Sequence, residues 1–461
     1  MKEYDIVVIG AGAGGLVLAT MANRKGLKTA MIDKGKIGGD CTHYGCIPSK
    51  TLLNIAKKYN SLSLLEEKWA LKGIKVSGKP DFSVIMEKVN ENIETIYEHT
   101  RPDVFREKGI DVFIDKSGAE FIDEYTVKIG EKELRFKNAV IATGSSPRDL
   151  EIPGFKEVGV LNTLNFWSVT KQPDSIAFIG GGVISAEIAQ AMAYLGTKVT
   201  IVEKHSEILG MIDEEVGDAI RDVFKENGIE SITGAEIKSF HKTDGKAVMV
   251  YEKNKEQKEL EAEKIFCAPG RQPNVKGMKL KNAGVEFSEK GIDVNEYLQT
   301  SCSHIYACGD VVQPFKFTHK ASYQAGLIVN NILNGNNKEN DLSALPWVIF
   351  TEPEVAHVGL SEKDAKEKYG DSINVFKVDA TIDRFVTDSE TKGFVKVIFD
   401  KDDYVLGADA IGAHAGEWIQ LFTLAIKHKI PAGEFKDTIF AYPTYSEIVK
   451  KAFTRYLRKK Q

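Results

Sequence analysis

The strongest constraint on the fold is a strand–turn–helix–strand unit at the start of the chain. Ile6–Ile9 is a continuous apolar run, as expected for a central parallel strand, and Thr29–Ile32 is a second run that ends at Asp33. The turn after the first run has the G-x-G-x-x-G spacing, with Gly10, Gly12 and Gly15. These glycines permit a tight turn, close approach of a pyrophosphate and packing of helix on strand, and the acid binds ribose hydroxyls. The unit predicts a dinucleotide site.

The same unit recurs later in the chain in the same register. Gly180 and Glu203 lie 170 positions after Gly10 and Asp33, and Gly182 repeats Gly12, while Ser185 replaces the third glycine. Two such units predict an α/β fold with two Rossmann-like dinucleotide-binding domains. Two dinucleotides indicate an electron relay, and one of them should be a flavin because a flavin can take hydride and reduce sulfur. Glu203 predicts NADH rather than NADPH, since a carboxylate accepts the ribose 2′-OH and repels a 2′-phosphate.

A second feature with chemical meaning is the glycine-flanked stretch Gly38–Lys50, which holds Cys41 and Cys46. Pro48 and the apolar residues after it predict a helix that starts near Cys46. A thiol near a helix N-terminus has a lowered pKa, and Lys50 can return to the same helix face. The pattern favours a reversible disulfide. The alternative is a pair of buried free thiols that act as small hydrophobic groups.

This stretch strongly resembles the redox-active disulfide motif of the class I pyridine nucleotide–disulfide oxidoreductases, a flavoprotein family that includes dihydrolipoamide dehydrogenase and mercuric reductase. The resemblance implies a homodimer with FAD and an active site shared across the interface. It implies that Cys46 lies next to the flavin, that Cys41 attacks the substrate and that Lys50 pairs with Glu187. Asp40 stands where many members carry Thr, a variation to which we attach little weight.

Further segments resemble the same family over nearly the whole chain. They are Ala139–Gly144, Ala268–Asn274, Ile305–Asp310 and Phe317–Ala321. By this resemblance, the additional cofactor-binding residues are Gly39, Thr143, Gly144, Gly270, Arg271, Gly309, Asp310 and His319. His319 taken alone is equally consistent with a structural role.

The C-terminal part resembles the dimerisation domain of that family, beginning with Phe350–Leu360. Phe394–Phe399 predicts a strand with alternating faces, and Trp418–Lys427 and Ser446–Leu457 predict amphipathic helices. The expected architecture is therefore two dinucleotide-binding domains plus a C-terminal α+β dimerisation domain. We place the first part of the FAD domain at 1–148, the NAD(P)H domain at 149–270, the second FAD part at 271–343 and the dimerisation domain at 344–461.

The chain departs from the family pattern at Tyr442. Members that act on thiols carry a His at this position, paired with a Glu that matches Glu447, as their general acid–base. Tyr, with an ordinary pKa near 10, is a poor proton shuttle at neutral pH. Mercuric reductases place a Tyr there too, but they also carry a C-terminal cysteine pair, and this chain has no cysteine after Cys308.

Composition excludes several other classes. A net charge of −5 gives no electrostatic basis for nucleic-acid binding. No apolar run approaches the roughly 20 residues that a membrane span needs. Among five cysteines, the Cys41–Cys46 pair has no second Cys or His pair at zinc-ligand spacing, so no metal site is expected. No signal peptide is recognisable at the first residues, and a cytoplasmic location is expected.

The leading hypothesis is an NAD(P)H:disulfide oxidoreductase-type flavoenzyme that passes electrons from NADH through FAD to Cys41–Cys46 and on to a disulfide or thiol substrate. A second hypothesis is a mercuric reductase-like enzyme that reduces a metal ion, a quinone or another small acceptor. A third is a redox sensor or subunit that docks on a partner without rapid turnover.

Overall fold

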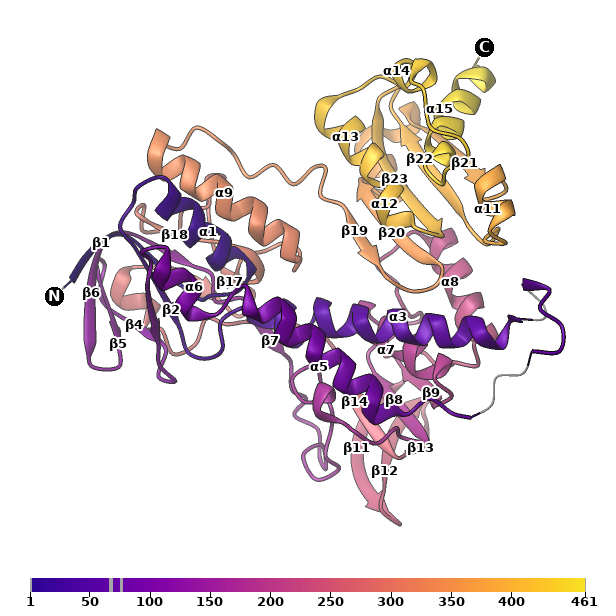
Figure 1. Cartoon of the computed structure of the whole chain (residues 1–461), viewed down its shortest axis with the longest axis horizontal. Coiled ribbons are helices and arrows are strands. Elements are labelled where there is room, and N and C mark those ends of the chain that lie inside the picture. The colour runs from indigo at the N-terminus through magenta and orange to yellow at the C-terminus, as the bar shows by residue number, and fades with distance from the viewer. Residues whose placement is uncertain (1, 66–68, 75–77, 461) are drawn as a thin grey trace.

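The chain folds into three units that lie around two long helices (Figure 1). The structure is a computed structural model and describes residues 2–65, 69–74 and 78–460. The N-terminal unit is built on a seven-stranded sheet, the middle unit on a four-stranded sheet and the C-terminal unit on a five-stranded sheet. Figure 1 shows the N-terminal unit on one side; on the other side the C-terminal unit, in orange and yellow, lies above α3 (Cys46–Ser63), and the middle unit, in pink, lies below it.

The N-terminal unit has a mostly parallel sheet in the order β3-β2-β1-β6-β5-β4, with β18 beside β6. Its strands are β1 (Lys2–Ile9), β2 (Thr29–Asp33), β3 (Asp111–Ile114), β4 (Ala119–Asp123), β5 (Thr126–Ile129), β6 (Lys132–Ile141) and β18 (Ile305–Ala307). Its helices are α1 (Ala13–Arg24), α2 (Gly39–His43), α3 (Cys46–Ser63), α5 (Phe82–Glu98), α6 (Pro102–Glu107) and α9 (Thr318–Asn334). Strand β18, which begins 164 positions after the end of β6, thus completes the first sheet, so the N-terminal unit is built from two parts of the chain.

The middle unit repeats the parallel arrangement in the order β10-β9-β8-β14. Its strands are β8 (Ser175–Ile179), β9 (Lys198–Val202), β10 (Glu230–Ile232) and β14 (Lys264–Cys267), with a meander of β11 (Glu236–Thr243), β12 (Lys246–Lys253) and β13 (Glu256–Ala262). Its helices are α7 (Val183–Tyr194) and α8 (Glu214–Glu226). Strands β7 (Ser145–Pro147) and β15 (Arg271–Pro273) pair antiparallel, so the chain enters and leaves this unit side by side.

The C-terminal unit is an antiparallel sheet in the order β19-β20-β23-β22-β21. Its strands are β19 (Trp347–Ile349), β20 (Glu354–Gly359), β21 (Asn374–Asp379), β22 (Phe394–Phe399) and β23 (Val405–Gly412). Its helices are α10 (Glu362–Tyr369), α11 (Asp383–Thr387), α12 (Ala415–Trp418), α13 (Gln420–His428), α14 (Ala432–Asp437) and α15 (Glu447–Lys460). The remaining short elements are β16 (Phe287–Ser288), β17 (Gly291–Ile292) and four 3₁₀ turns at Phe166–Ser168, Leu280–Ala283, Gly309–Val311 and Gly370–Ser372.

Two sequence predictions for the C-terminal unit need correction. The alternation predicted for β22 is wrong, because all six residues of this strand are buried, including Lys396 at 3% exposure. The side of the strand that was expected to face water is covered by α8 of the middle unit, whose carboxylates pair with Lys396. The helix predicted over Trp418–Lys427 is divided into α12 and α13.

One hydrophobic core joins the three units. It contains Leu52 of α3, Ile85 of α5, Phe178 of β8 and Ile188 of α7, together with Ile349 of β19. Burial of apolar surface therefore holds α3 and α5 against both other units. Within the described residues, no helix is long and apolar enough to cross a membrane.

The two glycine turns differ at their third position, which generates a prediction. A Cβ on Gly15 would lie 1.9 Å from the Gly10 carbonyl oxygen, whereas the middle unit accommodates Ser185 there, fully buried. We expect Gly15→Ser to lower the melting temperature strongly, because overpacking costs about 1–3 kcal/mol or more. Ser185→Gly is the matched control. The Ser185 hydroxyl has no hydrogen-bond partner among the described residues, so we expect its removal to change the free energy of unfolding by no more than about 1 kcal/mol. An equal decrease in the melting temperature of the two variants, measured by thermal unfolding, would contradict this explanation.

Candidate active site

The two cysteines of the redox stretch lie on consecutive helices. Cys41 is on α2, and Cys46 is the first residue of α3, directly after the N-cap Gly45. Both are free thiols in the structure. The pKa of Cys46 is lowered, chiefly by a hydrogen bond from the Cys41 thiol and also by the charge of Lys50, against the effect of burial. The same hydrogen bond, with burial, raises the pKa of Cys41. The pair can therefore exist as a Cys46 thiolate beside a Cys41 thiol.

Lys50 and Glu187 meet next to this pair. Lys50 Nζ lies 2.6 Å from Glu187 Oε2, and the Glu187 side chain is only 4% exposed. The backbone N–H of Phe350 donates to Glu187 Oε1 at 3.0 Å, and the Phe350 ring lies 4.7 Å from Lys50 Nζ. Glu187 thus contacts the N-terminal and the C-terminal units from the middle unit, and it fixes the cation one helical turn after Cys46.

The first glycine turn has the geometry of a pyrophosphate cradle. Gly10 has φ +103°, and a Cβ there would lie 2.4 Å from the Ala142 carbonyl oxygen. Gly12 caps α1, and a Cβ on Gly39 would lie 2.5 Å from the Gly12 Cα. Backbone atoms therefore lie close together at the N-terminus of α1, where unpaired N–H groups fit an anion. Asp33 at the end of β2 accepts the Ala11 N–H at 2.7 Å.

The second turn repeats this arrangement in the middle unit. Gly180 has φ +91°, and a Cβ there would lie 2.7 Å from the Ala268 carbonyl oxygen. Gly182 caps α7, and a Cβ on it would have open space around it. Glu203 accepts the N–H of Gly181 at 2.6 Å, as Asp33 does in the first unit, and the N–H of His205 at 2.8 Å. The two glycine-lined helix N-termini fit two dinucleotides, with Asp33 and Glu203 at the ribose ends.

A polar network that sequence reasoning missed joins the redox stretch to the predicted flavin acid. Arg271 lies 3.2 Å from Asp40 and donates through Nε to Ser145 Oγ at 2.8 Å, and Ser145 donates to Asp310 at 2.7 Å. Burial raises the pKa of Asp40, Arg271 opposes this, and the charge of Asp310 adds to it. The sequence signal for this network is the acid directly before Cys41, where many resembling proteins carry Thr. Asp40 is part of the site.

The other predicted cofactor residues lie around this network. Thr143 and Asn274 exchange two hydrogen bonds of 2.8 Å at the crossing between units. The crossing also contains Gly144, with φ +69°, and Gly270, with φ +135°. Gly309 follows β18 and donates to Gln324 at 2.9 Å.

The start of α9 brings Thr318, rather than His319, to the cysteines. Thr318 Oγ1 lies 3.7 Å from Cys46 Sγ and contributes to its lowered pKa. His319 Nε2 lies 2.7 Å from the Pro346 carbonyl oxygen, and burial lowers its pKa. Thr318 had no sequence signal of its own, because its role depends on the placement of α9.

Tyr442 and Glu447 form hydrogen bonds with other residues of the C-terminal unit. Tyr442 is 70% exposed, and a hydrogen bond with Asp383 raises its pKa further above the ordinary value. Glu447 accepts the N–H of Thr444 at 3.3 Å. The structure describes one chain, so their predicted approach to the cysteines of a partner subunit stays a prediction.

Comparison with known proteins identifies the family of this arrangement. A family model described as pyridine nucleotide-disulphide oxidoreductase matches residues 4–325, and the model of its dimerisation domain matches residues 345–453. A mercuric reductase from Staphylococcus aureus is 34% identical over 98% of this chain and 82% of that protein. A dihydrolipoyl dehydrogenase from Staphylococcus aureus is 35% identical over 98% of this chain and 96% of that protein.

A solved structure is similar over the whole chain. The Cu(II) complex of the HOCl-induced flavoprotein disulfide reductase RclA from Escherichia coli superimposes with a TM-score of 0.86 at 26% identity, covering 99% of this chain and 100% of the other.

The ion pair beside Cys46 leads to a prediction about its reactivity. Lys50→Met removes the charge that helps to lower the pKa of Cys46, so the pH profile of its alkylation should move to higher pH. At neutral pH the iodoacetamide rate should fall in proportion to the thiolate fraction, by about ten-fold for each unit by which the pKa exceeds the assay pH. Lys57→Met is the matched control, because Lys57 is two turns further along α3 and donates to the Thr351 carbonyl oxygen at 3.0 Å. Peptide mapping identifies the alkylated cysteine. A similar shift in both variants would mean that Lys50 has no specific role.

Proposed function

Because the chain belongs to the class I pyridine nucleotide–disulfide oxidoreductase family, we propose that it takes electrons from NADH, passes them through FAD to Cys41–Cys46 and reduces a small acceptor. The observation that carries this proposal is the placement of Cys46 at the start of α3, where Cys41, Lys50 and Thr318 lower its pKa. Bound FAD supplies a group that accepts hydride from a nicotinamide and reduces a disulfide. The protein acts as a homodimer through its dimerisation domain.

The proposal assigns the site residues to three groups: an FAD site, an NADH site and the cysteine pair. Gly10, Gly12 and Asp33 would hold the adenosine diphosphate part of FAD, and Asp310 and Arg271 would bind further along the same cofactor. Gly180, Gly182 and Glu203 hold NADH. The Glu203 carboxylate is buried and disfavours a 2′-phosphate, which supports NADH over NADPH. In the reduced pair, Cys46 would be the thiolate next to the flavin and Cys41 the thiol that meets the acceptor.

The surroundings of Tyr442 bear on the acceptor. A dithiol or disulfide substrate needs a general acid–base, and Tyr442, exposed and with its pKa raised by Asp383, supplies none near neutral pH. We therefore favour the alternative that the sequence left open, a thiolate-binding metal ion. Two sulfur ligands suit a soft ion such as Hg(II) or copper. One NADH reduces one Hg(II) to Hg(0), or two Cu(II) to two Cu(I), and yields NAD⁺ and one proton.

The metal ion is a substrate in this proposal and not a resident group. Among the described residues, no three His, Cys, Asp or Glu side chains are grouped as a metal site. The relatives support both classes of acceptor: mercuric reductase and the Cu(II) complex of RclA point to metal ions, and dihydrolipoyl dehydrogenase points to dithiols.

The test is an acceptor screen on the holoenzyme with Hg(II), Cu(II), a quinone and lipoamide. We expect NADH oxidation to depend on the metal ions and to be lost in Cys41→Ser, while Cys302→Ser, the control thiol outside the site, keeps it. Tyr442→His should raise lipoamide reduction, by about 100-fold if the imidazole acts as a general acid–base.

Two outcomes contradict the proposal in different ways. Lipoamide reduction by the unaltered protein that exceeds the metal-dependent rate would assign it to dithiol chemistry. Rapid reduction of the flavin by NADH without turnover on any acceptor would assign it to redox sensing.

A further inference from the structure

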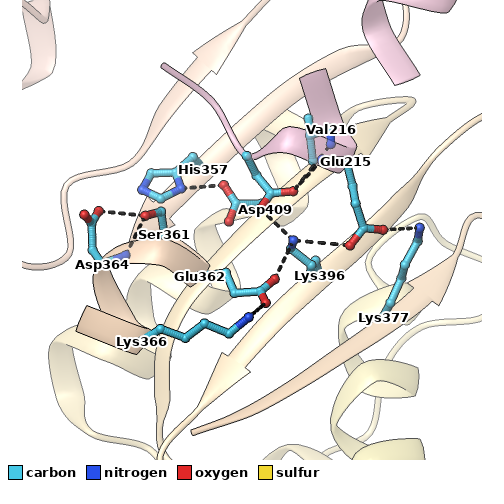
Figure 2. Close-up of polar contacts among 11 residues, drawn as sticks. Glu215, Val216, His357, Ser361, Glu362, Asp364, Lys366, Lys377, Lys396 and Asp409 are labelled. Carbon is cyan, nitrogen blue, oxygen red and sulfur yellow. Dashed lines mark hydrogen bonds and ion pairs between the residues drawn. The ribbon is translucent and has the colours of Figure 1, made fainter. Parts of the chain in front are cut away.

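A buried lysine connects the C-terminal unit to the middle unit, away from the cysteines. Lys396 on β22 has a side chain that is only 4% exposed, and its Nζ lies 2.6 Å from Asp213, 2.8 Å from Glu362 and 3.3 Å from Glu215. Figure 2 shows Lys396 between Glu215, on the pink segment of the middle unit, and Glu362 of the C-terminal unit. Three carboxylates from two units therefore converge on one ammonium group.

Asp213 takes part in both the helix and the ion pair. Its Oδ1 accepts the N–H groups of Glu215 and Val216 and caps α8, while its Oδ2 pairs with Lys396. The Asp213 side chain is 7% exposed. Glu362 of its own unit stays near Lys396, but the Lys396 ammonium and the buried Asp213 carboxylate lose each other when the start of α8 leaves β22. Separating two buried opposite charges is unfavourable, so this pair favours the docked arrangement.

The acid on the neighbouring strand, Asp409, does not pair with Lys396. Asp409 on β23 is opposite Lys396 in register, but its Oδ1 lies 2.7 Å from His357 Nδ1. His357 Nε2 lies 3.0 Å from the Gly359 carbonyl oxygen. Both ring nitrogens face acceptors, and only the doubly protonated ring donates at both. Burial lowers the pKa of His357, but the hydrogen bond and charge of Asp409 outweigh it, so the pKa is raised. Asp409 therefore pairs with His357 and not with Lys396.

The start of α8 is linked to the predicted NADH site. The chain from Glu203 to Asp213 folds back over the second glycine turn, where Leu209 donates to the Gly181 carbonyl oxygen at 2.8 Å. A Cβ on Gly181 would lie 2.6 Å from Ile208 Cγ2, so this segment touches the turn closely. A displacement of Asp213 would therefore reach both Gly181 and the end of β9.

We propose that Lys396 is a positioning residue that docks the middle unit on the C-terminal unit and so holds the NADH site in its productive place. This inference rests on the proposed function, because it assigns NADH to the middle unit. With the anchor removed, the middle unit also populates undocked arrangements, and apparent affinity for NADH falls by the fraction that remains docked. The reaction within a correctly docked complex is unaltered.

The experiment measures flavin reduction in the holoenzyme by stopped flow as a function of NADH concentration. Lys396→Met should raise the half-saturating NADH concentration by about ten-fold, as expected if one molecule in ten stays docked, with little change in the limiting rate. Lys396→Arg should restore most of the affinity. The matched control is Lys377→Met, because Lys377 on the adjacent strand also pairs with Glu215, at 2.7 Å, but is 40% exposed.

A second variant keeps the test sharp if Lys396→Met folds poorly. Asp213→Asn retains a helix-capping side chain and removes only the charge, so it should shift the NADH dependence in the same direction by a smaller factor. Wild-type NADH dependence in a folded Lys396→Met or Asp213→Asn variant, or an equal shift in Lys377→Met, would overturn the inference.

Reduction of the same proteins by dithionite separates the two proposals. Dithionite bypasses the NADH site, so all variants should give the thiolate–flavin charge-transfer band that the Cys46 assignment requires. Absence of that band in the unaltered protein would contradict the proposed function. Its presence together with unchanged NADH dependence in the variants would contradict the positioning role alone.

Discussion

The site depends on one carboxylate that contacts all three units. Glu187 belongs to the helix after the second glycine turn, pairs with Lys50 from the helix after the redox cysteines, and accepts the Phe350 N–H from the start of the C-terminal unit. It is nearly inaccessible to solvent, so its charge requires both partners. The cation that helps to stabilise the Cys46 thiolate is therefore in place only when the three units are assembled. The reactivity of Cys46 therefore depends on the assembly of all three units.

Burial of apolar surface also holds the units together, but it does little to fix their relative orientation. The core that contains residues of α3, α5, α7, β8 and β19 disfavours separation of the units, yet apolar contact alone tolerates small rotations. Directional contacts remove that freedom. Gln190, one turn after Glu187, accepts the Glu352 N–H at 2.8 Å and donates to the Glu352 carbonyl oxygen at 2.9 Å. Side chains on one face of α7 thus form hydrogen bonds with the backbone of the segment that enters the C-terminal unit.

The parts of the structure that were predictable from sequence are those governed by local chemistry. The turns at Gly10 and Gly180 need residues without a side chain, and each acid at a strand end is bonded back to its own turn, so spacing alone reveals both. The start of α3 at Cys46 follows from Pro48. The environments of Lys396 and Asp40 were not predictable, for the opposite reason. Their burial depends on partners, Asp213 and Arg271, that lie far away in the chain and come from other elements. A polar residue in an apolar strand is expected to face water unless another unit covers it.

The middle unit is held by charge at the beginning of each of its two helices. At α7 the holding group is the Glu187 carboxylate facing Lys50, and at α8 it is Asp213 facing Lys396. Both helices begin close to the second glycine turn, one directly after it and the other after the segment that folds over it. Two anchored points fix an axis, and the core fixes the remaining rotation about it. A nucleotide at this turn is therefore oriented by contacts to two different units. In the proposed function, the middle unit holds the nicotinamide cofactor in this orientation and delivers its electrons to a thiol pair that belongs to another unit.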